Sequence, residues 1–207
     1  MGKKSILLLR RFDRNKGARI AFLSSMSMLN ARDNEQRSYL EFVDALRQYG
    51  AASKEDMRML WRRIVFSILI SNTDDHLRNH GFLYENISGW LLSPAYDMNP
   101  VPVDIKPRVL STAIDLDNGT ASLDLALSFA NYFDLTKAEA LGIALEVGAA
   151  VSNWRPTAAN LGLNAAEIDR MSSVFEHADL KQALQQAKAR KKTAVRFLAN
   201  RMPTKIL

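Results

Sequence analysis

The spacing of apolar residues predicts a helix that ends near position 50. Tyr39, Phe42, Val43 and Leu46 recur three or four positions apart, and Gly50 follows them as a stop signal. Residues at this spacing share one face of a helix, so we expect that face to be buried against the rest of the protein.

A second and more apolar helix is expected to begin at Ser53-x-x-Asp56, a pattern that resembles a capping box. Its apolar positions follow one face and then widen it: Met57, Leu60, Ile64 and Ile68, with Trp61, Val65 and Phe66 beside them. A helix with so wide an apolar face is expected to lie in the centre of the core.

The helical period fails at Ser71, and the pattern becomes that of a β-hairpin. Residues 71–80 are polar and dense in charge. Two short apolar runs, 81–84 and 90–92, flank residues 86–89, which are typical of a turn. Several prolines then predict an irregular chain to about Arg108.

The remainder of the chain is predicted to be mostly helical. The expected helices cover residues 123–133, 136–151, 164–177 and 180–200. Thr136-x-x-Glu139 and Asn164-x-x-Glu167 are capping boxes for the second and third of these. Residues 13–35 are polar, with one short element at 20–28. The predicted fold class is therefore mainly α, with one small hairpin between helices.

The first residues predict a strand without an obvious partner. Residues 5–12 are largely apolar and have the pattern of a buried strand. A lone strand leaves its backbone N–H and C=O groups unpaired, so it needs neighbours. We expect either that its partners lie elsewhere in the chain or that the sequence is a truncated chain or a gene fragment.

The composition excludes cysteine chemistry and shows that the positive charge is concentrated near the C-terminus. The 207 residues are 47% hydrophobic and 24% charged, with no cysteine, which excludes disulfides and thiolate chemistry. The net charge is +6, but residues 181–207 contain eight basic and no acidic residues, so the preceding residues carry −2. This basic stretch is either a solvated helix face or a contact for nucleic acid or an acidic partner.

The sequence shows no sign of membrane insertion or secretion. The longest mainly apolar stretch, residues 64–70, is too short to cross a bilayer. No charged and then apolar leader with a small-residue cleavage site is present. We therefore expect a cytoplasmic protein with no membrane contact.

The densest polar cluster, residues 71–80, has the pattern that phosphoryl transfer needs. The reaction requires a carboxylate to accept the proton of the attacking hydroxyl, an amide oxygen on a magnesium ion, and a second carboxylate on that metal beyond a hairpin. Asp74 and Asn79 are five residues apart, the separation of base and amide in protein kinases. Asp97 follows the predicted hairpin. Oxygen ligands of this kind suit Mg²⁺.

Two other interpretations of the cluster remain open. His76 and His80 are four residues apart, and with Asp74 and Asp75 nearby they have the composition of a transition-metal site. However, Gly81 and the predicted hairpin argue against a helix that would place both rings on one face. The second alternative is a loop that is merely rich in hydrogen bonds.

Three motifs in order resemble the HipA-type serine/threonine kinases, the toxins of bacterial toxin–antitoxin modules. The run Thr73-Asp74-Asp75-His76-Leu77-Arg78-Asn79 is similar to their catalytic loop, and Ser93-Pro94-Ala95-Tyr96-Asp97 to their metal-binding segment. Arg11-Phe12-Asp13-Arg14 resembles the segment after their hinge strand. The resemblance covers about residues 5–180. It implies a protein-kinase-like C-terminal helical lobe (15–180) with an N-terminal hinge strand (1–14), and places 181–207 in a basic helix of the same domain.

The resemblance also implies a role for each matching position. Asp74 is the expected proton acceptor, and Asn79 and Asp97 are the expected ligands of Mg²⁺. The positions expected to contact ATP are Arg10 and Phe12 through their backbone, Asp13 near the ribose, His76, Leu77 and Arg78 along the phosphates, and Tyr96, Asn79 and Asp97 in the same pocket.

The chain departs from the family at its beginning. The family has an N-terminal lobe with a phosphate-covering loop and a lysine on the α- and β-phosphates, whereas only Lys3 and Lys4 precede the hinge-like strand here. Because positioning and electrostatics supply most of phosphoryl-transfer catalysis, we expect little activity from this chain alone.

The family resemblance implies an aminoacyl-tRNA synthetase as protein substrate and an antitoxin of the HipB type, which binds DNA, as partner. The chain's own contact with nucleic acid would be weak or indirect. The alternative is a non-catalytic helical module that binds an antitoxin or nucleic acid through its basic C-terminal stretch.

Overall fold

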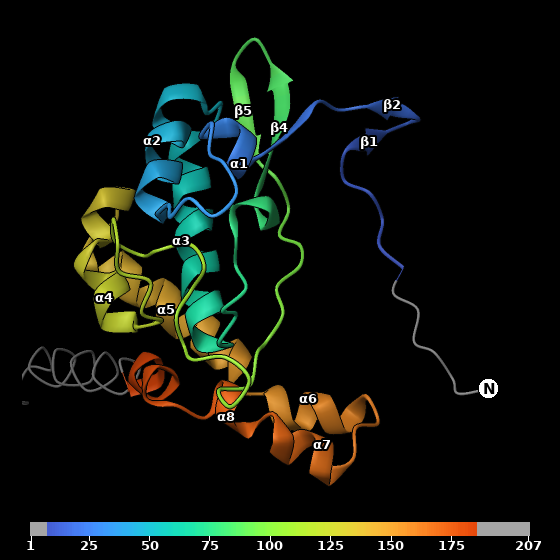
Figure 1. Ribbon diagram of the computed structural model, residues 1–207, viewed down its shortest axis with the longest axis vertical. Helices are drawn as coiled ribbons and strands as arrows, with labels where there is room; N and C mark the ends of the chain where they lie inside the picture. Colours follow the sequence, from blue (N-terminus) through green and yellow to red (C-terminus); the bar gives the residue numbers. More distant parts are fainter. Residues whose placement is uncertain (1–7, 186–207) are drawn as a thin grey trace, which may run out of the picture.

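The structure, a computed structural model, describes residues 8–185. Figure 1 shows a helical body with a three-stranded sheet at one end and a pair of short helices, α6 and α7, at the other. The N-terminal segment, with the two-residue strands β1 (Arg14–Asn15) and β2 (Ala18–Arg19), runs along one side of this body. This is the mainly α lobe that the sequence predicts.

Helix α3 (Ser53–Leu69) is the centre of the core, as its wide apolar face predicts. It packs against α2 (Tyr39–Tyr49) on one side and α5 (Lys137–Val151) on the other. Trp61, Ile64 and Ile68 are almost completely buried. Burial of each such side chain contributes about 1.5–3 kcal/mol relative to exposure, so α3 provides a rigid base for the loop that leaves its C-terminal end.

The predicted hairpin is confirmed and gains a third strand. Strands β4 (Gly81–Asn86) and β5 (Gly89–Leu92) pair antiparallel, and β3 (Phe22–Ser24) pairs antiparallel with the other edge of β4. Gly89, the first residue of β5 after the turn, has φ +120°, a conformation that side chains rarely tolerate. Strand β3 continues directly into the one-turn helix α1 (Ser25–Met28), so the short element expected at 20–28 is a strand followed by a helical turn.

The C-terminal half contains α4 (Leu123–Ser128), the 3₁₀ turn η2 (Ala130–Phe133), α5, α6 (Trp154–Asn160), α7 (Ala165–Arg170) and α8 (Ser172–Phe175). The capping boxes at Thr136 and Asn164 are both present, with reciprocal hydrogen bonds to Glu139 and Glu167. Residues 178–185 are helical, and the rest of the helix predicted at 180–200 lies outside the described residues.

The strand predicted at residues 5–12 is wrong where the structure describes it. Residues 8–12 form no strand, and Leu8 and Leu9 are exposed. Strand formation needs a partner edge, and the pairing in this region occurs later, between β1 and β2.

The capping box predicted at Ser53 is also wrong. The Asp56 carboxylate accepts the backbone N–H of Leu92 at 2.9 Å, and the Ser53 hydroxyl donates to the Leu46 carbonyl at 2.6 Å. Both side chains therefore connect α3 to neighbouring elements, and the N-terminus of α3 has no side-chain cap.

Two helices predicted as continuous are broken, and α6 was not predicted. The segment 123–133 changes to a 3₁₀ turn after Ser128, and the segment 164–177 breaks at Met171. Near each break a serine hydroxyl donates to the carbonyl three residues earlier, Ser128 to Leu125 and Ser172 to Asp169. Such bonds compete with the regular helical pattern.

Among the described residues, no helix has the length and apolar character that a bilayer crossing requires.

Candidate phosphoryl-transfer site

The two segments that carry the predicted site run side by side. The loop of residues 71–80 follows α3, and residues 93–101 follow β5 (Figure 1). Two hydrogen bonds join them, Tyr96 Oη–H to Arg78 O at 2.7 Å and Val101 N–H to Ser71 O at 3.2 Å. Just beyond the first segment, Ser93 N–H donates to the carbonyl of Gly81, the first residue of β4, at 2.8 Å. The hairpin β4–β5 thus reverses the chain direction, so that residues 93–101 lie beside residues 71–80.

Asp74 and Asn79 are connected directly. The side-chain amide of Asn79 donates from Nδ2 to the backbone carbonyl of Asp74 at 3.1 Å. Asn79 is nearly buried at the end of the 3₁₀ turn η1 (Leu77–Asn79), whereas the carboxylate of Asp74 is exposed. The bond closes the loop and leaves Asn79 Oδ1 without a protein hydrogen bond among the described residues.

Asp97 is connected to this loop through its neighbour Tyr96. The Tyr96 hydroxyl donates to the carbonyl of Arg78, the residue before Asn79. Asp97 comes directly after this attached tyrosine. Asp97 is exposed and has φ +54°, a left-handed conformation that aspartate tolerates better than most side chains. Its Oδ1 accepts a hydrogen bond from Asn99 Nδ2 at 2.6 Å.

A buried network supports the loop from behind, and sequence reasoning missed it. The Asp75 carboxylate accepts hydrogen bonds from the Tyr39 hydroxyl and from Ser67 Oγ (3.1 Å), and it lies 2.8 Å from His80 Nε2. Its backbone carbonyl accepts from Thr112 Oγ1 at 2.7 Å. Asp75 points into the core while Asp74 points out, so the two adjacent aspartates have different roles. The sequence signal was an Asp-Asp pair with a histidine five residues after the second member.

The pKa shifts of Asp75 and Tyr39 agree with the hydrogen bonds of this network. Burial alone would raise the pKa of Asp75, but the His80 ring and the hydrogen bonds from Tyr39 and Ser67 outweigh it and lower that pKa. Burial, and then the neighbouring Asp75 carboxylate, raises the pKa of Tyr39 well above its ordinary value. Tyr39 therefore stays protonated and donates to an ionised Asp75.

His76, Leu77 and Arg78 line one side of a polar pocket of about 270 Å³. Leu77 itself is buried, and Arg78 is ion-paired with Asp33. His76 is half-buried, and its Nδ1 has no hydrogen-bond partner among the described residues. The three side chains thus have different surroundings, although the family resemblance implies one role for them.

The N-terminal residues reach the site to different degrees. The Phe12 ring lies 5.6 Å from the Tyr96 ring and 6.2 Å from the Phe22 ring, so it joins the second segment. Asp13 is paired with Arg11 and Arg14, and the hydrogen bond from Arg11 is the main reason that its pKa falls to about 2. Arg10 is exposed.

With this geometry in place, comparison with known proteins identifies the family. Residues 1–155 match the family model of the HipA-like C-terminal domain. The chain belongs to this family. The resemblance drawn from the three motifs is therefore confirmed, and the tied segments 71–80 and 93–101 are part of a HipA-like C-terminal domain.

Two relatives show how much of a longer protein this domain covers. A Haemophilus influenzae (strain Rd) protein named "Putative kinase" is 30% identical over 122 residues, covering 54% of this chain and 35% of that protein. A HipA chain from the solved complex of Shewanella oneidensis MR-1 HipA, HipB and operator DNA superposes with a TM-score of 0.60 at 18% identity, over 85% of this chain and 47% of that one. The chain spans about a third to a half of these proteins.

The chemistry of the donor set fits magnesium. Asn79 Oδ1 and the Asp97 carboxylate are oxygen donors, and Mg²⁺ usually takes one or two carboxylates and keeps several waters. The histidine alternative has no comparable support, because His80 is buried against Asp75. The described residues also contain no group of three or more His, Cys, Asp or Glu side chains that could hold a metal ion.

Three basic residues around the HipA-like loop were not singled out from the sequence. Buried Arg63 donates to the Ser93 carbonyl, and burial lowers its pKa. Arg108 donates to Ser71 Oγ (3.1 Å), to the Ile68 carbonyl (3.0 Å) and to Asp179 (2.7 Å). Lys106 lies beside Asp74. The first two hold the start of each segment in place.

A more apolar groove of about 730 Å³ lies between α3, α5 and residues 92–98. Pro94, Ala95 and Met98 line it, but Asp74, Asn79 and Asp97 do not. It is therefore separate from the candidate site.

Proposed function

We propose that this chain is the catalytic C-terminal lobe of a HipA-like serine/threonine protein kinase. In the complete protein, it would transfer the γ-phosphoryl group of ATP to a serine or threonine of another protein. The observation that carries the proposal is the hydrogen bond between Tyr96 and the Arg78 carbonyl, which brings the segment of Asp97 beside the loop that holds Asp74 and Asn79.

Asp74 is the proton acceptor in this proposal. Its carboxylate is exposed, while Asn79 holds the backbone of the same residue. The oxygen of the acceptor hydroxyl bonds to the γ-phosphorus, and the hydroxyl proton passes to Asp74. The bond from that phosphorus to the β–γ bridging oxygen breaks, and its electron pair leaves with ADP.

Asn79 and Asp97 would hold Mg²⁺. Asn79 is suited because Nδ2 is already used by the Asp74 carbonyl, which orients Oδ1 away from it. When bound, the ion would neutralise charge on the nucleotide phosphates.

The nucleotide would lie between the N-terminal segment and the two tied segments. Phe12 and Tyr96 offer neighbouring aromatic faces to a flat base. Arg10 and Phe12 would contribute backbone groups, Asp13 would lie near the ribose, and His76, Leu77 and Arg78 would follow the phosphates.

Partners are proposed from the neighbouring structure, which contains HipB and operator DNA with HipA. By analogy, an antitoxin of the HipB type would bind the complete protein, and contact with DNA would be indirect or weak. The protein substrate proposed from the family resemblance is an aminoacyl-tRNA synthetase.

The proposal is tested by phosphoryl transfer from radiolabelled ATP to a serine-containing protein in the presence of Mg²⁺. The purified chain is assayed alone and with the separately expressed N-terminal half of Shewanella oneidensis HipA. We expect little transfer alone, more in the mixture, and loss of the gain with Asp74→Asn. Asp117→Asn, an exposed change of the same charge, is the matched control. Equal activity of Asp74→Asn and wild type would overturn the role of Asp74.

A further inference from the structure

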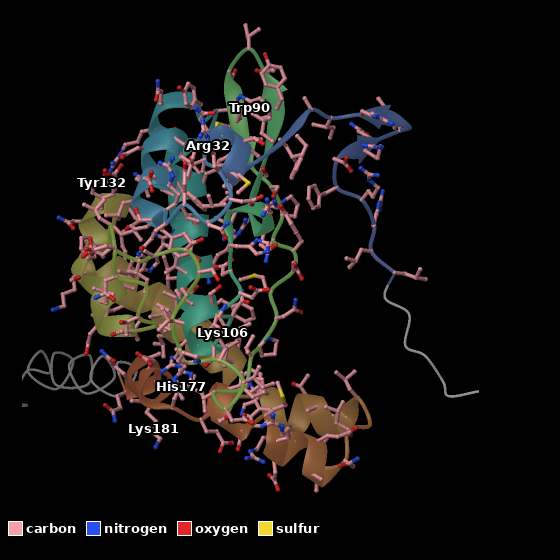
Figure 2. All side chains as sticks on the ribbon, in the orientation of Figure 1. Arg32, Trp90, Lys106, Tyr132, His177 and Lys181 are labelled. Carbon is pink, nitrogen blue, oxygen red and sulfur yellow. The ribbon has the colours of Figure 1, made fainter. Side chains whose placement is uncertain are left out.

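Lys106 is held beside the proposed base by oxygen atoms of the same loop and of Ser111. Its Nζ donates to the Thr73 carbonyl at 2.8 Å, lies 3.5 Å from Ser111 Oγ, and lies 3.8 Å from Asp74 Oδ1. Figure 2 shows Lys106 near the C-terminal end of α3, where the loop begins. Neither the family motifs nor their spacing points to this residue, because it lies beyond both segments.

The chain around Lys106 fixes its position on both sides. The backbone N–H groups of Ile105 and Lys106 donate to the Pro102 carbonyl at 2.9 and 3.2 Å, which forms a tight turn. Two residues later, Arg108 is bound to Ser71, Ile68 and Asp179. A lysine held this way loses less freedom when it binds a ligand than a lysine on a free loop.

We infer that Lys106 binds the γ-phosphoryl group of ATP and accompanies it to the acceptor hydroxyl. This inference rests on the proposed kinase function. It adds that Lys106, which lies in the segment after Asp97, supplies a positive charge to the phosphoryl group that is transferred.

The need of the Thr73 carbonyl for a hydrogen bond does not by itself account for Lys106. The Thr73 carbonyl already accepts a hydrogen bond from Ser111 Oγ at 2.9 Å, so it does not need the lysine to satisfy it. An ammonium group has three N–H donors, and its contact with Asp74 at 3.8 Å is longer than a hydrogen bond. The side chain is 41% exposed, so an incoming anion can reach it.

The positive charge of Lys106 suits the step in which Asp74 accepts the hydroxyl proton. Before transfer, Lys106 would contact both the Asp74 carboxylate, 3.8 Å away, and the γ-phosphoryl group. As the hydroxyl proton moves to Asp74, that carboxylate becomes neutral, and negative charge remains on the phosphoryl oxygens and the departing ADP. A cation fixed at this position then interacts more strongly with the phosphoryl group, which is the differential stabilisation that accelerates the step.

The test compares two nucleotides that differ by the γ-phosphoryl group. Affinities of the full chain for Mg²⁺ with AMP-PNP and for Mg²⁺ with ADP are measured by NMR titration, which detects binding at millimolar concentration. We expect the wild type to prefer AMP-PNP, and Lys106→Met and Lys106→Gln to lower this preference about tenfold, the value of one charge-assisted hydrogen bond. Glutamine can still donate to Thr73, so it separates charge from structure. Lys54→Met, at an exposed position in the first turn of α3, is the control and should keep the preference.

The outcomes separate this inference from the proposed function. If wild type binds both nucleotides equally, or if Lys106→Gln keeps the wild-type preference, Lys106 does not bind the γ-phosphoryl group, and the kinase proposal is unaffected. If wild type binds neither nucleotide at millimolar concentration, this chain does not form a nucleotide site by itself, and the inference that its Lys106 recognises the γ-phosphoryl group is overturned.

Discussion

The hydroxyl of Tyr96 donates to the backbone carbonyl of Arg78 at 2.7 Å, across 18 residues of sequence. This bond joins the segment that carries Asp97 to the residue before Asn79. The hairpin β4–β5 brings the two segments near each other, and the bond fixes the position of Tyr96 relative to Arg78.

Replacing Tyr96 by phenylalanine tests this connection. We expect Tyr96→Phe to weaken Mg²⁺ binding roughly fivefold or more and to reduce the free energy of unfolding by about 1 kcal/mol, since one hydrogen bond is lost and a carbonyl loses its partner. Calorimetric titration with Mg²⁺ and urea denaturation measure the two effects. Tyr84→Phe, in β4, removes a hydroxyl for which the structure gives no hydrogen bond and is the control. Unchanged Mg²⁺ affinity in Tyr96→Phe would show that the connection is unnecessary.

The buried Asp75 network predicts a large loss of stability when its acid is removed. Asp75→Ala leaves Tyr39, Ser67 and His80 without their shared acceptor inside the core. Removal of one member of a buried pair costs about 3–5 kcal/mol, and we expect a reduction of this size in the free energy of unfolding from urea denaturation. Asp33→Ala, which removes an exposed ion pair with Arg78, should cost below about 1 kcal/mol. Similar costs for the two variants would contradict the importance assigned to the network.

Asp179 predicts the direction of acid destabilisation. Burial alone would raise its pKa, but the His177 ring, whose Nδ1 lies 3.4 Å from Oδ2, and the hydrogen bonds from the Leu123 N–H and from Arg108 outweigh it and hold the pKa well below its ordinary value. A carboxyl with a lowered folded-state pKa contributes stability above its unfolded pKa, about 3.9 for aspartate, and loses it as the pH falls toward the folded value.

The measurement is the difference in unfolding free energy between wild type and Asp179→Asn across the pH range 6 to 3. We expect the wild type to be more stable at pH 6 and the difference to shrink below about pH 4. A difference that grows as the pH falls would show that Asp179 is not stabilised as an anion in the folded protein.

Salt dependence separates the kinase proposal from the alternative of a binding module. If nucleic acid binds through the basic residues of 181–207, its affinity should fall steeply with salt, by a slope of about −0.9 per phosphate contact on double-stranded DNA. Asp74→Asn should leave such binding unchanged. Replacement of Lys188, Arg190, Lys191 and Lys192 by glutamine should make the dependence of log affinity on log salt concentration less steep. A filter-binding or fluorescence assay measures this dependence. An unchanged slope in that variant would place any nucleic-acid contact elsewhere.

Local patterns in the sequence predicted the elements that frame the site. The helical period gave α2 and α3 because burial of one face is a local property of residues three and four apart. The capping boxes at Thr136 and Asn164 were recognisable for the same reason. Ser53 and Asp56 had the same local pattern, but contacts with Leu46 and Leu92 used both side chains, and no local signal reveals such partners.

The site was predicted as a set of candidate residues, and their surroundings were not. Spacing suggested Asp74, Asn79 and Asp97, and their roles stay predictions, as do the domain boundaries at residues 14 and 180. The contacts between Asp75 and Tyr39 and between Lys106 and Thr73 join residues more than thirty positions apart. Such contacts depend on which loops the folded core brings together, and this information is spread over the whole chain.

Paramagnetic NMR with Mn²⁺ in place of Mg²⁺ tests the proposed cation site most directly. Mn²⁺ has similar ligand preferences and broadens the signals of nuclei close to it. We predict that substoichiometric Mn²⁺ broadens the signals of residues 74, 79 and 97 together, and that Asp97→Asn removes the effect at all three. Broadening at only one of these positions, or persistence of the effect in Asp97→Asn, would contradict a cation shared by the two segments.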